Sequence, residues 1–219
     1  PSTINDFFDL EKFPGKRGIH TWGNGIVEMA LYASGVAIPD IYDVLDTQEG
    51  QDMVFAKLDT IKDDVVFWSS GAKPLDLVNS GEVSMSLAYN GRIGGAVLAD
   101  GADYVTVWDG QVLEEEWLVL VTGAPNRAAA IHFLIHASAT EQQAGQARWI
   151  NYAPMRPSAL PIMEAGEPWF NPGLATEANI MEHMPTTAEH MKGGILADPD
   201  WWADNGQAVN DRYAAWMAK

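Results

Sequence analysis

The chain has 219 residues, 47% hydrophobic and 20% charged, a balance that is ordinary for a globular protein with a substantial core. A formal net charge of −17 argues against nucleic acid or an anionic membrane surface as the main partner, because both select lysine and arginine. The absence of cysteine excludes disulfides and thiolate chemistry, and no apolar run approaches the roughly 18 residues of a membrane span, so we expect no direct membrane insertion.

The first part of the chain alternates between strand and helix patterns. Residues 17–22 form a strand candidate, and apolar residues then recur at helical spacing over 26–33 until Gly35 ends the helix. Thr47 is placed to cap a second helix with an apolar face, and residues 65–68 return as a strand. This alternation predicts an α/β sheet with helices on both faces.

The segment from Phe67 to Arg92 is the most informative about function. It combines a buried strand ending at Trp68, a short helix entered through Pro74 and stopped by Gly81, and a strand over 83–88 that delivers Tyr89 and Asn90 to an edge. Ligands of open parallel sheets settle at the carboxyl ends of the strands. We therefore expect the aromatic side chains of this segment to line a ligand site.

The pattern changes in the second half of the chain. Residues 104–108 and 116–121, on either side of Asp109-Gly110, predict a hairpin-like, antiparallel excursion. Asn126 is then placed to cap an alanine-rich helix that runs to Ser138, and Thr140 to Gln143 match a capping box. From there to the end the sequence is mostly helical in character.

Several short motifs keep a fixed order along the chain. Together with the segment 67–92, they resemble the solute-binding proteins of spermidine/putrescine-type (polyamine family) ABC transporters. The motifs that carry the resemblance are Asp6-Phe-Phe-Asp9, Phe13-Pro-Gly-Lys-Arg-Gly18, Trp117, Gly123-Ala-Pro-Asn126, Asn151-Tyr-Ala-Pro154 and Asp200-Trp-Trp-Ala-Asp-Asn205.

The resemblance implies a type II periplasmic-binding-protein lobe, a mixed sheet with helices on both faces that forms a partial second lobe. It implies that residues 1–118 form ligand-binding lobe two, that residues 119–161 are a crossover segment of lobe one, and that residues 162–219 return to pack on lobe two. Family members begin with an export signal and most of a first lobe. We therefore expect a periplasmic protein whose signal segment and most of whose first lobe are not in this chain.

The resemblance also implies a set of ligand-binding residues. Tyr89, Trp117 and Tyr152 match positions that line the family's polyamine cleft, with Ser69 as a neighbouring polar contact. Aromatic faces attract an ammonium group by about 0.5 to 2 kcal/mol, so such rings can form a cage for an amine. The alternative for each ring, and above all for a tryptophan on a strand, is core packing.

The chain departs from the family where carboxylates pair with ligand amines, since those positions match Trp22, Gly25 and Val119. Fewer acids weaken the case for a polyamine. Gly23 and Gly25, at a helix amino terminus, instead offer backbone N–H groups to an acid. We therefore expect an organic amine ligand that is either polyamine-like or, as the missing acids favour, a monoamine or zwitterion of an amino-acid-like or opine-like kind.

Other candidate groups and functions follow from the same sequence. Arg92 is a secondary candidate for a ligand carboxylate, although a surface ion pair explains it equally well. The spacing of His132 and His136 does not form a metal motif, and we predict no metal, cofactor or catalytic residue.

The expected partner is the membrane permease of an ABC importer. The alternatives are a carbohydrate-active enzyme with aromatic subsites and a truncated fragment that binds nothing.

Overall fold

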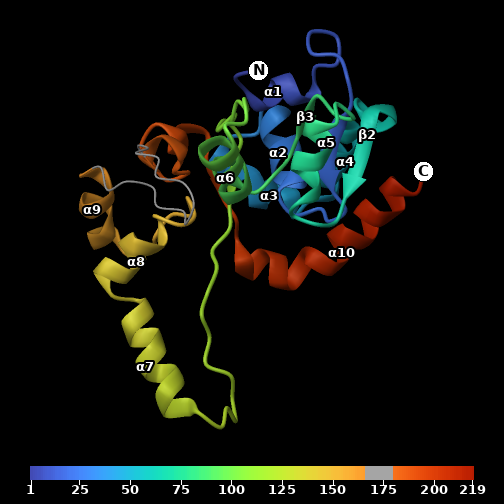
Figure 1. Ribbon diagram of the computed structural model, residues 1–219. Helices are drawn as coiled ribbons and strands as arrows, with labels where there is room; N and C mark the ends of the chain where they lie inside the picture. The colour runs from blue at the N-terminus through green and yellow to red at the C-terminus, as the bar shows by residue number, and fades with distance from the viewer. Residues whose placement is uncertain (166–179) are drawn as a thin grey trace. The chain divides into compact units, whose positions relative to one another are not determined.

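The computed structural model describes residues 1–165 and 180–219, which divide into two compact units. Unit 1 comprises residues 1–89, 105–114 and 188–219, and unit 2 comprises residues 90–104 and 115–187 (Figure 1). The predicted lobe boundaries, after residues 118 and 161, stay a prediction. The predicted return segment, 162–219, includes residues 166–179, which lie outside the described residues.

Unit 1 is built around a three-stranded parallel sheet with the order β2-β1-β3. The strands are β1 (Arg17–His20), β2 (Val65–Trp68) and β3 (Met85–Ser86). The register places Arg17 opposite Val65 and His20 opposite Trp68, so β1 and β2 end at the same edge.

Five α-helices precede or follow these strands, with two short 3-10 helices between them and a third near the C-terminus. The α-helices of unit 1 before residue 90 are α1 (Ile4–Phe8), α2 (Ile26–Ala33), α3 (Ile41–Leu45), α4 (Gln48–Asp59) and α5 (Lys73–Asn79). The 3-10 helices of the unit are η1 (Ile38–Asp40), η2 (Lys62–Asp64) and η5 (His190–Gly193), and the long C-terminal helix is α10 (Pro199–Met217).

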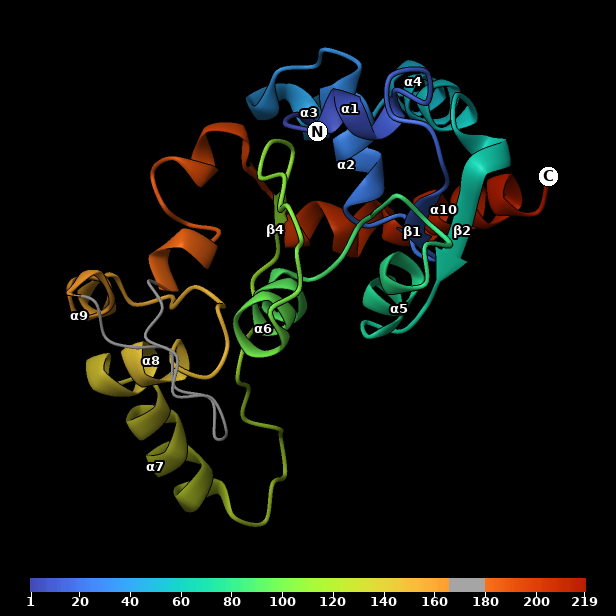
Figure 2. The same ribbon diagram turned by 45° about the horizontal axis from the view of Figure 1, so that its top comes forward.

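Helices cover both faces of the sheet, as the sequence predicts. Because side chains alternate along a strand, Val65 and Phe67 on β2 pack into the main core with α2, α4 and α10. Val66 and Trp68 point to the other face, where they pack with Leu77 of α5. Figure 2 shows α4 and α5 on opposite sides of β2. The predicted strand at 65–68 and helix at 26–33 are confirmed, and Thr47 does cap α4, accepting the Gly50 N–H at 2.9 Å.

A buried arginine fixes the N-terminal segment to the sheet. The Arg17 side chain is inaccessible to solvent. Its Nε donates to the Phe7 carbonyl at 2.6 Å, Nη2 donates to the Phe13 carbonyl at 2.6 Å, and Nη1 reaches Ser84 Oγ at 3.1 Å. A buried charge is tolerated only where its donors are satisfied, so these acceptors hold residues 7–15 against the start of β1.

The predicted antiparallel hairpin around Asp109-Gly110 is wrong. The structure instead has a short strand, β4 (Val112–Leu113), that pairs in parallel with β5 (Ile195–Leu196). Gly110 turns the chain at φ +78° and donates its N–H to the Gly193 carbonyl at 2.9 Å. Glu114, Glu115 and Glu116 are exposed and follow β4 directly, so like charges favour solvent over a continued strand.

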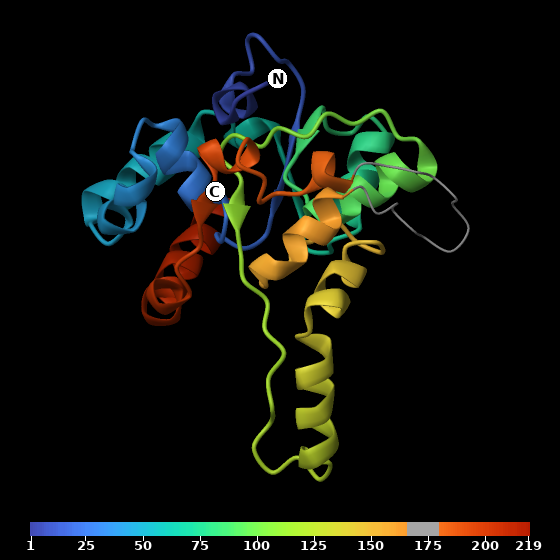
Figure 3. The ribbon, with the colours of Figure 1, turned by 90° about the vertical axis from the view of Figure 1, so that its left-hand side faces the viewer.

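Unit 2 is helical in its described part. Its helices are α6 (Asn90–Asp100), α7 (Arg127–Ala137), α8 (Thr140–Gln146), η3 (Pro157–Ala159), α9 (Leu160–Glu164) and η4 (Ile180–His183). A small core of alanine, methionine and isoleucine side chains joins α8, η3, α9 and η4. Figure 3 shows α7 extending away from α8, and this helix buries none of its side chains.

Two details of unit 2 differ from expectation. Asn90, predicted at a strand end, begins α6, where its Nδ2 donates to the Asn151 carbonyl at 2.6 Å while Asn151 Nδ2 donates back to the Asn90 carbonyl at 3.1 Å. Thr140 is not a capping residue, because the helix is preceded by Ala139 and the Thr140 hydroxyl bonds Ser158 Oγ at 2.8 Å. Tertiary hydrogen bonds override the local pattern in both places. None of the helices in residues 1–165 and 180–219 combines the length and apolar character of a membrane span.

The packing of α4 against α3 makes a sharp stability prediction at Gly50. A Cβ added there would lie 1.9 Å from the Val44 carbonyl oxygen. We expect Gly50→Ala to lower the free energy of unfolding by about 1 to 3 kcal/mol, although alanine is the better helix former. Urea unfolding measures the change. Gly95→Ala, whose Cβ would meet no atom within 4 Å, is the control and should be neutral or stabilising. Equal midpoints for the two variants would contradict this account.

Candidate functional site

Four aromatic side chains form a continuous row at the carboxyl edge of the unit 1 sheet. The His20 ring lies 4.5 Å from the Trp22 ring and 4.5 Å from the Trp68 ring, measured between centroids. Trp68 in turn makes an edge contact with Tyr89 at 6.2 Å. We call these four residues the aromatic row. It exists because His20 and Trp68 are paired across the last position of β1 and β2.

The row is buried in the middle and open at both ends. His20 and Trp68 are 8% and 4% exposed, whereas Trp22 is 61% exposed and Tyr89 is 42% exposed. Ser69, the next residue after β2, is also exposed. The two outer rings can therefore meet a ligand, while the two inner rings hold them in place.

Close packing at Tyr89 depends on a glycine. A Cβ added to Gly71 would lie 3.2 Å from two carbon atoms of the Tyr89 ring, a contact tighter than side chains normally make. The buried indole N–H of Trp68 has no hydrogen-bond partner within residues 1–165 and 180–219. Trp68 therefore contributes to the row through ring packing.

The turn after β1 does not offer the donors that the sequence suggested. The Gly23 N–H is donated to Asn210 Oδ1 at 2.8 Å, and the Gly25 N–H is donated to Glu28 Oε2 at 2.8 Å. Both groups are thus engaged within the chain. The expectation that the Gly23 and Gly25 N–H groups bind a ligand carboxylate is therefore wrong. Trp22 is the exposed side chain of this turn.

At the start of α2, the carboxylate of the buried Glu28 accepts the Gly25 N–H that the sequence assigned to a ligand carboxylate. Glu28 is fully buried, and its Oε1 accepts from Trp202 Nε1 at 2.7 Å and from the Tyr42 hydroxyl at 2.9 Å. Burial raises the pKa of Glu28, whereas these donors act in the opposite direction. The sequence signal for this contact is a glutamate three residues after Gly25, which is the position of the acid in a capping box.

Unit 2 brings together two of the predicted residues, Arg92 and Tyr152. The Tyr152 ring packs against α6 where Gly91 leaves room, since a Cβ there would lie 2.6 Å from the ring. Burial, and then the charge of Glu116, raise the pKa of Tyr152, and the charge of Arg92 lowers it. The charge of the exposed Arg92 guanidinium therefore acts on the Tyr152 phenol within this unit.

Trp117 lies in an extended stretch of unit 2 that is not a strand, contrary to the prediction that placed it on one. Its side chain is 63% exposed. Exposure keeps Trp117 available to a ligand but does not by itself distinguish a binding role.

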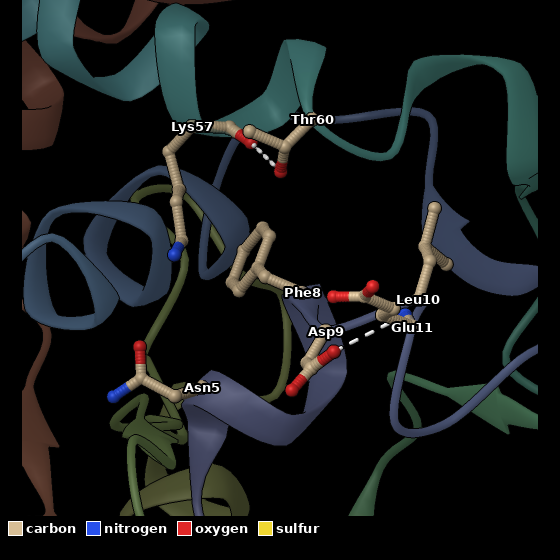
Figure 4. A pocket seen from close by; sticks show the side chains of 7 residues that line it. All are labelled: Asn5, Phe8, Asp9, Leu10, Glu11, Lys57 and Thr60. Atoms are coloured by element: carbon tan, nitrogen blue, oxygen red, sulfur yellow. Dashed lines mark hydrogen bonds between the residues drawn. The ribbon is translucent and has the colours of Figure 1, made fainter.

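An open hollow in unit 1 contains none of the predicted residues. Figure 4 shows the Lys57 side chain above the Phe8 ring, with its Nζ 4.9 Å from the ring centroid. The hollow is lined by Asn5, Phe8, Asp9, Leu10, Glu11, Lys57 and Thr60. These residues come from α1, the turn after it and the end of α4, away from the carboxyl ends of β1 and β2. Within the described residues, no cluster of histidine and acidic side chains could hold a metal ion.

The parallel sheet with helices on both faces matches solved structures of periplasmic binding proteins. The structure of MotA from Agrobacterium tumefaciens B6 in complex with glucopine matches with a TM-score of 0.83 and 30% identity over 99% of this chain and 64% of that one. A structure described as a GABA receptor matches with a TM-score of 0.79 and 31% identity over 100% of this chain and 62% of that one. The predicted fold class is confirmed.

Sequence comparison gives the family. Residues 1–176 match the model of the bacterial extracellular solute-binding proteins, and the chain belongs to this family. The gamma-aminobutyric acid-binding protein of Pseudomonas aeruginosa is 34% identical over all 219 residues, which correspond to 58% of its length. The chain thus spans less than two thirds of the relatives it matches. These relatives are solute-binding proteins, in line with the interpretation of a binding protein and not of a carbohydrate-active enzyme.

The Glu28 contacts predict a specific loss of stability. In Glu28→Gln an NH2 group must replace one oxygen, so at least one of the surrounding donors loses its acceptor in a buried place. We expect the free energy of unfolding to fall by about 1 to 3 kcal/mol. Urea unfolding followed by tryptophan fluorescence is the measurement. Glu49→Gln, at an exposed position of α4, is the matched control. An unchanged midpoint in Glu28→Gln would show that the buried carboxylate is dispensable.

Proposed function

We propose that this chain is part of the extracytoplasmic receptor of an ABC importer that binds γ-aminobutyrate or a closely similar zwitterionic amine. The observation that carries the proposal is the aromatic row, whose exposed ends, Trp22 and Tyr89, present ring faces at the carboxyl edge of the sheet. The match of all 219 residues to 58% of a gamma-aminobutyric acid-binding protein supports the same class of ligand.

In unit 1, Trp22 and Tyr89 receive the ligand's ammonium group through cation–π contacts, with Ser69 as an adjacent hydroxyl. A ring face attracts one ammonium by about 0.5 to 2 kcal/mol, which suits a monoamine. A polyamine carries several ammonium groups and needs carboxylates to neutralise them when it is buried. At the positions where polyamine receptors are expected to carry acids, this chain has Trp22, Gly25 and Val119.

In unit 2, Arg92 is the proposed contact of the ligand's carboxylate, because guanidinium binds carboxylates in a bidentate manner. Tyr152 supplies a neighbouring hydroxyl, and its position is fixed by the packing at Gly91. Trp117 adds an exposed ring. Gly25 contributes to the site through the conformation of the turn. Its N–H does not bind the ligand, because it donates to Glu28.

The remaining features of the proposal follow from the family. A receptor of this class works in the periplasm and delivers its ligand to a membrane permease. The chain itself catalyses no reaction in this role. The expected protein partner of the complete receptor is therefore the permease. The ligands to compare are γ-aminobutyrate, glucopine-type compounds and other amino-acid-like amines.

Ligand preference is the direct test. With protein produced from the complete coding sequence, we expect γ-aminobutyrate or an opine-type compound to bind more tightly than putrescine and spermidine, because the rings can hold one ammonium but lack paired acids. Competition calorimetry measures the order of affinities. Tightest binding by spermidine would contradict the proposal and return the protein to the polyamine receptors.

Single substitutions test the residues. Trp22→Ala, Tyr89→Ala and Trp117→Ala should each weaken binding of the preferred ligand by about 1 kcal/mol or more, since each removes a ring face. Phe133→Ala, an exposed ring on α7 outside the proposed contacts, is the control and should leave affinity unchanged. If Tyr89→Ala and Phe133→Ala behave alike, the aromatic row is not the binding element.

A further inference from the structure

His20 lies between Trp22 and Trp68 in the aromatic row and makes a hydrogen bond with Trp22. Its Nδ1 accepts the backbone N–H of Trp22 at 2.9 Å, and its ring is tilted by 54° against the Trp22 ring. On its other side the Trp68 ring stands at 89° to it. His20 is therefore enclosed by two indoles, and it is the group that fixes the backbone of the exposed Trp22.

The hydrogen bond defines the protonation state of His20. An Nδ1 that accepts an N–H must carry its lone pair, so the single proton of the neutral ring sits on Nε2. A second proton, taken from solvent, would make both ring nitrogens donors. The Trp22 N–H would then face another N–H, and the contact that fixes Trp22 would be lost.

The surroundings of His20 favour the neutral ring. Burial lowers its pKa, and no charge of the described residues contributes to that shift. The neighbouring strands, β2 and β3, carry no titratable side chain.

The titratable groups next described, on α2 and α10, bind partners other than the His20 ring. Glu28 on α2 binds the side chains of α3 and α10, and Tyr213 on α10 donates its hydroxyl to the His20 carbonyl at 2.9 Å. Arg212, next to Tyr213, pairs with Asp52 on α4. Among the residues that the structure describes, no carboxylate forms a hydrogen bond or ion pair with the His20 ring, and no charge shifts its pKa.

We propose that His20 is a positioning residue that holds Trp22 in its binding orientation only while the imidazole is neutral, so that acid weakens binding of the ligand's ammonium. The ligand part of this inference rests on the proposed function. Two effects of protonation have the same sign. The Trp22 backbone loses its acceptor, and an imidazolium 4.5 Å from the indole competes with the ligand cation for the same ring and repels it.

The same protonation reduces stability, and this effect does not depend on a ligand. Because the pKa of His20 is lowered in the folded protein, the unfolded chain binds more protons between that pKa and the unperturbed value of about 6.5. The contribution of His20 to stability is therefore complete above about pH 6.5 and is lost as the pH falls through the folded pKa.

Two variants separate the roles of His20. His20→Asn keeps an acceptor near the position of Nδ1 and cannot titrate, whereas His20→Phe keeps a ring and removes the acceptor. His132→Asn, at an exposed position of α7, is the matched control. The readouts are the amide resonance of Trp22 in 15N spectra without ligand and the affinity for γ-aminobutyrate by calorimetry, both followed from about pH 8 to about pH 5, across the ordinary range of histidine titration.

In the unsubstituted protein, the Trp22 amide should shift with the titration of His20, and affinity should fall at least about threefold over the same range. His20→Asn should abolish this pH dependence, His20→Phe should bind weakly at every pH, and His132→Asn should follow the unsubstituted protein.

A Trp22 amide resonance that does not shift with the titration of His20 would overturn the proposal, as would an unchanged pH profile of affinity in His20→Asn. If the amide follows His20 but γ-aminobutyrate does not bind at any pH, the proposed ligand fails and the positioning role stands. The titration of the unsubstituted protein gives this answer even if a variant does not fold.

Discussion

The attachment of the C-terminal helix to the turn between β1 and α2 is the constraint on which the architecture of unit 1 depends. Three hydrogen bonds make it, from Trp202 Nε1 to Glu28, from the Gly23 N–H to Asn210 and from the Tyr213 hydroxyl to the His20 carbonyl. Residues more than 170 positions apart are thereby joined at the edge that carries the aromatic row. Buried polar groups of this kind are costly when a partner is lost, so α10 fixes the turn as firmly as the strands do. Arg17 does the same for the opposite end of β1, where it binds backbone carbonyls of residues 7–15.

This constraint changes what the turn can do for a ligand. A helix amino terminus with free N–H groups attracts an anion, but here the protein's own Glu28 accepts the Gly25 N–H and Asn210 accepts the Gly23 N–H. The Trp22 ring remains exposed at the surface, and His20 contacts both its ring and its backbone N–H. The chemistry of this edge is thus aromatic and uncharged, which matches one ammonium group better than several. The acid group of a zwitterion requires a cation, and Arg92 stays the proposed residue for that role.

Glycines decide how closely these groups pack. Gly91 and Gly94 on α6 leave room for the side chains of Tyr152 and Asn151, and the exchange of hydrogen bonds between Asn90 and Asn151 fixes the start of that helix. Gly71 plays the same part for Tyr89 in unit 1. Glycine weakens a helix by about 0.5 to 1 kcal/mol relative to alanine, so the glycine-rich α6 owes its stability to these contacts and not to local propensity.

The sequence by itself determined the elements whose signals are local and periodic. The helix at 26–33, the strand at 65–68 and the Thr47 cap follow from apolar spacing and capping chemistry. The order of short motifs indicated a bacterial solute-binding protein, which is confirmed, whereas the polyamine type is not confirmed. It also named Trp22, Tyr89, Arg92 and Tyr152, although their roles stay a proposal. Only the tertiary structure decided which polar groups are already engaged. The pairing of β4 with β5, the bond from the Gly23 N–H to Asn210 and the enclosure of His20 between two indoles join residues that no local pattern relates. Each depends on packing between distant segments, because a donor or a ring acquires its partner only when those segments meet.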